Sequence, residues 1–409
     1  MTVRRPLRSR PLVLAVGLAL VATGCSLGDA PTPGVADDGA GPTSYRIAPD
    51  CPPPPAEPPA VSVDLLNTYL AETDLPAWQA ADIGARTQLS DGRLVWVFGD
   101  TVRTDAYSPQ VVSNSMLVSS GVCAGQVLPD GDGPIVPDTT TDLDGGGEVV
   151  HWPMSVVALE PGHEFADGET TDVLVVLTAR TRRGGTGNDA ALDYAFLGTT
   201  ASVFTVSAGG APTLVESMEV TPDDASLDQV NWGAAATVTD DWFYVYGTRQ
   251  VEGSFGRELH VARVPVDDPR DRSRWEFWDG GDWQADIGSS VAVLPADGGV
   301  SQTLSVDALD PSGSAGFVAV SKQDGDLGDF ATVWSAPAPY GPWTQGDRVP
   351  APAGFDTGNL LYAPLAHPEI ELADGRLLVS VSRNTTDFGR LLAEPTEVGR
   401  PVFTEIDRP

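Results

Sequence analysis

From about residue 61 onward, the chain alternates short runs of β-branched and aromatic residues with clusters of turn-forming residues. The 3.6-residue period of an amphipathic helix is missing, apart from one short pattern at residues 63–70. This alternation is typical of strands joined by tight turns, and the 44 glycines and 35 prolines agree with it. The pattern therefore predicts an all-β fold.

The predicted strands fall into five groups of about four. A radial repeat with this count is a five-bladed β-propeller with roughly four antiparallel strands per blade. A large two-sheet sandwich is the competing architecture. Three groups open alike, with a polar or aromatic cluster before small residues, and small residues suit the crowded axis of a propeller. The groups span residues 81–128, 154–220, 233–278, 302–348 and 363–406, the last with a strand predicted at Leu391–Ala393.

The N-terminal segment carries a different pattern. Four arginines precede an apolar run at residues 12–21, and small residues and Cys25 follow it. That order is typical of a signal peptide over residues 1–24. A cysteine directly after small residues resembles a bacterial lipobox, which would make Cys25 the lipid-modified N-terminus of the mature protein. Ordinary secretion with an incidental cysteine is the other interpretation, so we expect an exported protein, either anchored outside the cytoplasmic membrane or secreted.

Residues 25–60 are rich in proline and glycine and cannot bury a core, which predicts an extended tether before a single domain at 61–409. With Cys25 assigned to lipid, Cys51 and Cys123 remain as a pair. An exported protein can oxidise such a pair. A bridge there would fasten the end of the tether to the first sheet.

Charge and motifs exclude several classes of function. A net charge of −33 argues against nucleic acid and other polyanions as partners, while a neutral sugar polymer is compatible with it. No cluster has zinc-like spacing, and both the G-x-S-x-G motif and a phosphate-cradling glycine loop are absent from the sequence. The acids of the loop 324–329 could bind calcium, but an Asp- and Gly-rich turn is the commoner interpretation. We expect no metal site and no required cofactor.

The segment Trp78–Arg103 predicts a hairpin with one acid near the open end of each strand, Asp82 and Asp100. If the loop is Ser90-Asp91-Gly92, partner residues sum to 182 and the two acids face each other. A two-residue loop would make the sum 183 and turn them to opposite faces. Facing carboxylates lie about 5 Å apart at Cβ and repel, so one of them retains its proton at neutral pH. Such a pair can act as general acid with base or nucleophile.

In a propeller, the first residues of the inner strands converge on the channel and form one pocket. Aromatic rings beside carboxylates and amides would suit a sugar. The tryptophans in these positions could instead pack between the blades, and the histidines could be hydrogen-bonded structural residues. Arg249 reaches a substrate or pairs with Glu252, and Arg180–Arg183 is interpreted as a solvated loop. The candidate substrate-binding residues are His151, Trp152, Asn231, Trp232, Arg249, Tyr362 and His367, with Ser305 or Asp307 in the fourth group.

The string ADIGARTQLSDGRLVWVFGDT, residues 81–101, resembles the first-blade signature of a five-bladed propeller family of exported actinobacterial proteins. That family, long catalogued as a domain of unknown function, includes endo-D-arabinanases (glycoside hydrolase family 183). The resemblance extends to Asn114-Ser115-Met116, His151-Trp152-Pro153, Tyr244–Gly247 and Gly375–Ser380.

The resemblance implies that Asp82 and Asp100 are the catalytic pair and that the reaction hydrolyses α-D-arabinofuranosyl linkages in cell-wall arabinan. The carboxylate separation would then decide the outcome, about 5 Å for retention and above about 6 Å for inversion. Related five-bladed hydrolases often hold a cation in the channel through a last-blade histidine, for which His367 is the candidate here. They also take an acid from the third blade, where this chain has Asn231.

The predicted partner is therefore an arabinogalactan- or lipoarabinomannan-type polysaccharide, with a membrane contacted only through the lipid anchor. We expect a monomer. The alternative is a propeller that binds glycan or protein without catalysis, in which case both aspartates would be dispensable for ligand binding.

Overall fold

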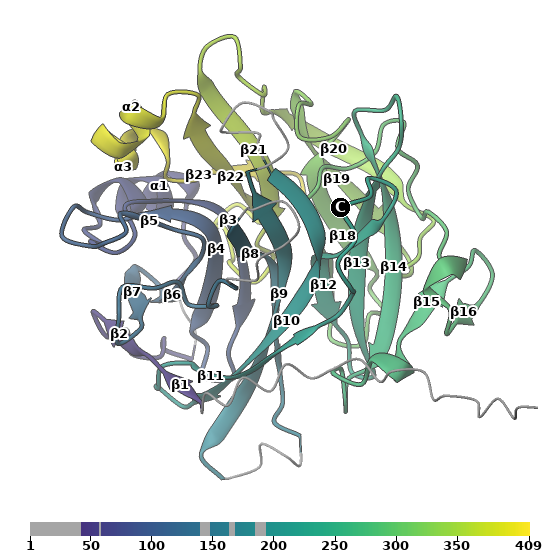
Figure 1. The fold of residues 1–409 in the computed structure, drawn as a ribbon, viewed down its shortest axis with the longest axis horizontal. Coiled ribbons are helices and arrows are strands. Elements are labelled where there is room, and N and C mark those ends of the chain that lie inside the picture. The colour runs from purple at the N-terminus through teal and green to yellow at the C-terminus, as the bar shows by residue number, and fades with distance from the viewer. Residues whose placement is uncertain (1–41, 57–58, 140–147, 163–167, 185–193) are drawn as a thin grey trace, which may run out of the picture. The chain divides into compact units, whose positions relative to one another are not determined.

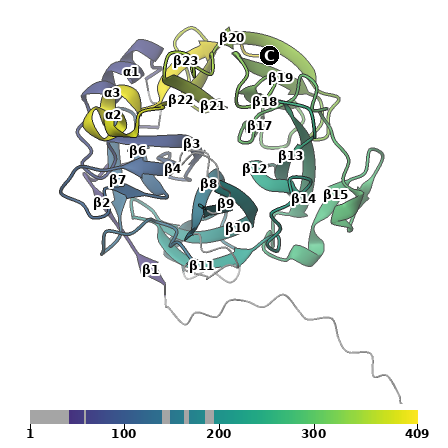
Figure 2. The same cartoon turned by 45° about the horizontal axis from the view of Figure 1, so that its top comes forward.

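The structure, a computed structural model, describes residues 42–56, 59–139, 148–162, 168–184 and 194–409. Within these residues, five antiparallel sheets follow one another around a central channel (Figures 1 and 2). The predicted all-β fold and the five-bladed β-propeller are therefore confirmed. Cys25 and the predicted signal segment 1–24 lie outside the described residues. No helix in the described ranges is long and apolar enough to cross a membrane.

Each blade takes its inner strand from the start of its sequence segment. The first blade consists of β3 (Ala80–Gln88), β4 (Leu94–Val102), β6 (Ser115–Ser120) and β7 (Cys123–Leu128), and the short β5 (Val111–Val112) also pairs with β4. The second consists of β8 (Glu148–Leu159), β9 (Thr170–Arg183), β10 (Tyr194–Ser207) and β11 (Thr213–Glu219). The third consists of β12 (Val230–Val238), β13 (Trp242–Gln250), β14 (Arg257–Pro265), β15 (Glu276–Trp278) and β16 (Trp283–Gln284). The fourth consists of β17 (Ser305–Ala308), β18 (Phe317–Lys322), β19 (Phe330–Ala336) and β20 (Thr344–Pro350), and the fifth of β21 (Asn359–Ala366), β22 (Leu377–Thr385) and β23 (Val402–Ile406).

The fifth blade closes the ring with help from the helix α1 (Val63–Glu72), which begins at the N-cap Ser62. Asn67 on this helix exchanges two hydrogen bonds with the backbone of Phe403 on β23, at 2.9 and 2.8 Å. The strand predicted at Leu391–Ala393 is wrong, because these residues belong to the helix α2 (Phe388–Ala393), which α3 (Pro395–Val398) follows. A helix capped by Asp387 therefore stands where a fourth strand was expected.

Neighbouring blades are joined by small hydroxyl side chains that bond to the backbone of the next inner strand. Four of these side chains are on inner strands, and the fifth, Ser382, is on β22. Every junction of the ring has such a bond: Thr87 Oγ1 with Ala158 N (3.0 Å), Ser155 Oγ with Gly233 O (2.8 Å), Thr237 Oγ1 with Ala308 N (3.0 Å), Ser305 Oγ with Ala366 N (2.8 Å) and Ser382 Oγ with Ile83 N (2.9 Å).

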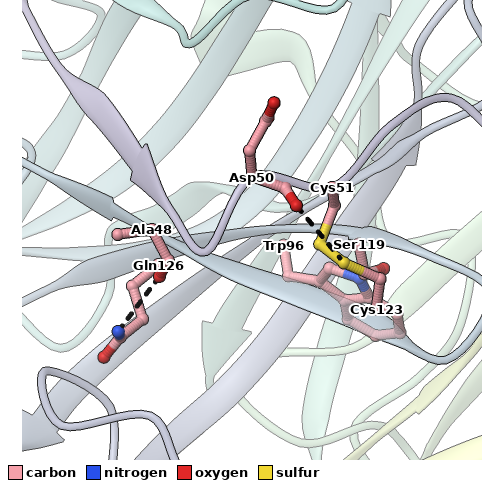
Figure 3. Close-up of a disulfide and its surroundings, with 7 residues drawn as sticks. All are labelled: Ala48, Asp50, Cys51, Trp96, Ser119, Cys123 and Gln126. Carbon is pink, nitrogen blue, oxygen red and sulfur yellow. Dashed lines mark hydrogen bonds between the residues drawn. A yellow bond between two sulfur atoms is a disulfide. The ribbon is translucent and has the colours of Figure 1, made fainter.

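The end of the predicted tether is part of the fold. The strands β1 (Thr43–Ser44) and β2 (Arg46–Ala48) extend the second and first sheets by pairing with β11 and β7. Directly after them, Cys51 and Cys123 form a disulfide, so the segment is covalently attached to the first blade (Figure 3). The extended tether predicted for 25–60 therefore does not describe residues 43–51.

A β-bulge interrupts four of the five inner strands near the end where they begin. The register shifts lie at Ala81–Ala85 on β3, Pro153–Ser155 on β8, Trp232–Ala235 on β12 and Tyr362–Leu365 on β21. These are the similar openings seen in the sequence. Bulges re-aim side chains and are common beside functional sites. We call the face of the propeller at which the inner strands begin the mouth face.

Candidate active site

The hairpin of the first blade adopts the register whose partners sum to 182. Leu89 N donates to Arg93 O at 2.8 Å across the loop Ser90-Asp91-Gly92, and Ala81 pairs with Thr101 at the other end. Between these ends, Gly99 and Asp100 lie opposite Asp82. A Cβ built on Gly99 would be 3.7 Å from the Cβ of Asp82. The loop therefore has the three-residue register, but bulges interrupt the ladder between Ala81 and Ala85, so Gly99 is the residue directly against Asp82. Asp100 follows Gly99 and is near enough for its charge to raise the pKa of Asp82.

The backbone directly after Asp82 is strained. Ile83 has φ of +72° and Gly84 has φ of +96°. A β-branched residue in the left-handed region is an outlier, and such conformations persist where the surrounding structure holds them. Here Ser382 of the fifth blade holds it, since its hydroxyl accepts the bond from Ile83 N. The backbone next to Asp82 is therefore held by the fifth blade.

Asp82 accepts hydrogen bonds from uncharged donors of the fifth blade. The hydroxyl of Tyr362 on β21 donates to Asp82 Oδ1, and Asn384 on β22 approaches the same oxygen at 3.4 Å. Burial raises the pKa of Asp82 to about 7, and the Asp100 carboxylate contributes to the rise against the lowering effect of Tyr362. Asp82 is therefore a carboxyl that carries a proton near neutral pH.

Asp100 lies among donors of the second blade, one of them a cation. Trp152 Nε1 on β8 donates to Asp100 Oδ1 at 2.8 Å, and a guanidinium nitrogen of Arg183 on β9 contacts the same oxygen. The Arg183 guanidinium also lies 5.6 Å from the centre of the Trp152 ring. Burial raises the pKa of Asp100, and Arg183 and Trp152 oppose that rise. The cation therefore favours the ionised form of Asp100.

Arg183 was missed by the sequence reasoning, and the solvated loop predicted for Arg180–Arg183 is wrong. The strand β9 continues through Arg183, so the arginines are part of a blade. Arg180 is buried and bonds to Asp223 at 2.8 Å through Nε. The sequence feature that could have placed Arg183 on a strand is the alternation of polar and charged residues directly after the apolar run of β9. Asn384 was also missed, although it follows an apolar strand in the same way.

The channel behind this mouth has a volume of about 520 Å³ and is lined by all five inner strands. On β3 the lining starts at Ala85, so Asp82 lies on the mouth side of the cavity. Inside it, Arg86 contacts Asp307 at 3.2 Å and Glu369 at 2.5 Å. Burial raises the pKa of Glu369 to about 7, which Arg86 opposes. This ion-pair cluster links the first, fourth and fifth blades.

Three of the predicted substrate-binding residues are buried in the blades. The Trp232 side chain is only 1% exposed and packs edge-on against Phe277, with ring centres 5.1 Å apart, so the structure contradicts its predicted contact with substrate. His151 is also buried, and burial together with Arg180 lowers its pKa to about 4. Asn231 is buried opposite Thr248. Trp232 therefore packs within the blades and His151 is a buried structural residue, the alternative interpretations given for them from the sequence.

Two further predicted residues have partners within the blades. Arg249 contacts Glu258 on β14 at 2.5 Å, because the two face each other across the ladder, and the predicted pairing with Glu252 is wrong. His367 lines the channel, but its ring is fully buried, 5.0 Å from the ring centre of Trp96, with Nε2 2.7 Å from Ser380 Oγ. Of the predicted set, the structure brings Trp152 and Tyr362 to the aspartates.

The described residues contain no group of three or more His, Cys, Asp or Glu side chains able to hold a metal ion. Next to the acidic loop 324–329, which was considered as a calcium site, lies a buried lysine. Lys322 is buried, and its ammonium donates to Asp326 O at 3.3 Å. Burial lowers its pKa to about 8 against the carboxylates of Asp326 and Asp329.

A family profile described as "Domain of unknown function (DUF5005)" matches residues 64–408. A comparison with curated proteins finds no match.

Among solved structures, the chain is similar to a GH43_1 enzyme from Xanthomonas citri (14% identity, 83% of this chain and 93% of that one, TM-score 0.44). It is also similar to an endo-arabinase from Bacteroides thetaiotaomicron (13% identity, 83% of this chain and 99% of that one, TM-score 0.39). A third is the Hadza microbial sialidase Hz136 (14% identity, 76% of this chain, TM-score 0.41), of whose length the chain spans about half, 54%. These likenesses concern the fold alone.

Proposed function

The chain belongs to the DUF5005 family, and we propose that it is a glycoside hydrolase that cleaves α-D-arabinofuranosyl linkages in cell-wall arabinan. Asp82 is the general acid, and Asp100 is the base or nucleophile. The substrate class follows from the resemblance of residues 81–101 to the first-blade signature of a family that includes endo-D-arabinanases. The chemistry follows from the two aspartates themselves.

One observation carries the proposal: Asp82 and Asp100, on the two strands of one hairpin at the mouth, have different hydrogen-bond and ion-pair partners. Asp82 is bonded by the neutral Tyr362 and Asn384, whereas Asp100 is paired with Arg183. Glycosidases need one protonated and one ionised carboxyl on either side of the scissile bond.

The division of roles follows from these partners. Asp82 gives its proton to the glycosidic oxygen as the bond from that oxygen to the anomeric carbon breaks, which leaves Asp82 ionised. Asp100 attacks the anomeric carbon or takes a proton from the water that does so. Trp152 donates to Asp100 and orients it, and Arg183 keeps it charged before the substrate arrives.

A non-catalytic glycan-binding propeller is the second candidate, and the ion pair between Asp100 and Arg183 favours it. A carboxylate that an arginine already engages can serve to hold the second blade against the first. In that case Asp100→Asn would leave polysaccharide binding intact and there would be no product to measure.

The setting of the reaction is part of the same proposal. Cys25 carries the lipid that holds the protein on the outer face of the cytoplasmic membrane, and residues 26–42 connect it to the propeller. The protein acts there as a monomer on arabinogalactan or lipoarabinomannan.

Digestion of defined polysaccharides tests the proposal. We expect purified protein to release arabino-oligosaccharides, identified by mass spectrometry, from arabinogalactan and lipoarabinomannan, with no release from β-1,3-galactan. Absence of products from both arabinans at pH 5 to 7 would contradict the proposed activity.

A further inference from the structure

A second group of exposed aromatic and apolar side chains lies on the mouth face, on the loops of the third and fourth blades. Phe255, in the loop between β13 and β14, is 77% exposed, and Leu327, in the loop between β18 and β19, is 51% exposed. Large apolar side chains in water indicate a binding surface when they gather at one place. Four of the five exposed aromatic residues among those described belong to this face: Tyr194, Phe255, Phe355 and Phe388.

The two loops form one rigid platform. A Cβ on Gly325 would lie 2.0 Å from Phe255 O, so the backbones of the loops are in direct contact. Gly325 has φ of +80°, which an L side chain rarely adopts. The buried ammonium of Lys322 fixes the fourth-blade loop through Asp326 O. Phe255 and Leu327 are therefore presented by a surface that is already ordered.

Polar groups accompany the apolar ones. Arg257 donates to Gln302 Oε1 at 3.3 Å, and Gln302 N donates to Asp326 Oδ1 at 3.3 Å. Arg257 is two residues after Phe255 in sequence, and Asp326 directly precedes Leu327. Apolar surface beside a guanidinium, an amide and a carboxylate is the composition that binds sugar rings, whose C–H faces stack and whose hydroxyls need donors and acceptors.

Tyr194 connects this platform to the aspartates. Its ring meets the Trp152 ring edge-on, with centres 5.2 Å apart, and Trp152 bonds directly to Asp100. Burial raises the pKa of the Tyr194 hydroxyl, which Asp326 raises further and Arg257 lowers, so both charged groups of the platform act on this hydroxyl. Contacts therefore run from Asp100 through Trp152 to Tyr194, and the Tyr194 hydroxyl is within electrostatic range of Arg257 and Asp326.

We propose that Phe255, Leu327, Arg257 and Asp326 form a distal sugar-binding site that holds the same polysaccharide chain several units away from the scissile bond, with Tyr194 between the two sites. The inference rests on the proposed function, because the ligand of the distal site is the substrate proposed there. The net charge of −33 agrees with a neutral polymer as the occupant. The site makes the protein select long chains over short ones.

The test compares a polymer with a short substrate. We expect Phe255→Ala to raise KM for arabinogalactan roughly tenfold, equivalent to about 1.4 kcal/mol, while kcat/KM for a p-nitrophenyl arabinofuranoside stays within about twofold. Val122→Ala, also on an exposed residue (54%) but on the turn at the opposite face, is the matched control and should change neither value. An unchanged KM for the polymer, or an equal loss on both substrates, would overturn the proposal.

A binding measurement separates this inference from the proposed function. In affinity gel electrophoresis with arabinogalactan, the Asp100→Asn protein should be retarded, and Asp100→Asn/Phe255→Ala should lose most of that retardation. This result supports the distal site even if wild-type protein releases no product. Equal retardation of both proteins would overturn the distal site. A change from dimer to monomer caused by Phe255→Ala in light scattering would also overturn it, because the surface would then bind a second copy of the protein.

Discussion

The hydroxyl of Tyr362 in the fifth blade donates to the carboxylate of Asp82 in the first blade, although 280 residues separate them. The bond crosses the junction at which the ring closes, where Ser382 also holds the backbone of Ile83 at 2.9 Å. The proton affinity of Asp82 therefore depends on correct closure of the propeller. A residue at the start of the fold and one near its end form a single functional unit.

The pH profile of kcat/KM should have its alkaline limb near pH 7. Burial and Asp100 raise the pKa of Asp82 to about 7, so the acid loses its proton above that pH and activity falls. Tyr362 lowers this pKa, and Tyr362→Phe should therefore move the limb to higher pH. Tyr45→Phe is the control, since the Tyr45 hydroxyl bonds to Ile135 O. A limb that does not move in Tyr362→Phe would exclude Asp82 as its origin.

Loss of Arg183 should shift both the acidic and the alkaline limb of the pH profile of kcat/KM to higher pH. Arg183 lowers the pKa of Asp100 and that of Asp82, so both rise in Arg183→Gln and activity requires a higher pH. We expect kcat/KM at pH 5.5 to fall by roughly 10- to 100-fold. Arg182→Gln is the matched control, because successive side chains of a strand point to opposite faces. Equal profiles for the two variants would contradict the role of Arg183.

Asp82→Asn should stabilise the fold at high pH and not at low pH. A buried carboxyl whose pKa is raised to about 7 opposes folding once it ionises, so the penalty is absent below about pH 4 and complete above pH 7. Three pKa units correspond to about 4 kcal/mol, which water at the mouth reduces to about 2 kcal/mol. Urea unfolding at pH 8 and pH 4 measures the difference. A gain of equal size at both pH values would contradict the raised pKa.

Two tryptophans with similar sequence surroundings should behave differently. Trp152→Phe removes the donor to Asp100 and should lower kcat/KM roughly tenfold with an unfolding free energy within about 1 kcal/mol of wild type. Trp232→Ala empties a site in the core and should reduce that free energy by about 4 kcal/mol. The folded fraction of Trp232→Ala should retain the wild-type kcat/KM. Reversed effects would mean that the two roles are exchanged.

The fold could be predicted because strand periodicity and turn residues act locally. The three-residue loop is one of two alternatives that the sequence leaves open, and the structure has it. The bulge that sets both Gly99 and Asp100 opposite Asp82 was not predicted. The helix α2 was missed because its N-cap Asp387 lies in a polar stretch that is equally typical of a turn.

The site was harder to predict than the fold, for two physical reasons. First, a bulge changes which side chain faces the channel: Trp152 points to Asp100, while Trp232 at the corresponding opening packs in the core. Second, Arg183 and Asn384 reach the aspartates from other blades, and the sequence does not show how blades are placed side by side. His151 and His367 were chosen for their chemistry, but burial lowers the pKa of each.

Release of arabino-oligosaccharides from arabinogalactan by wild type, Asp82→Asn and Asp100→Asn tests the central claim most directly. If Asp82 and Asp100 are the acid and the base or nucleophile, each substitution should lower the rate by at least about 10³-fold while circular dichroism and the unfolding transition show a folded propeller. Oligosaccharide release by either variant at a rate within tenfold of wild type would contradict the account.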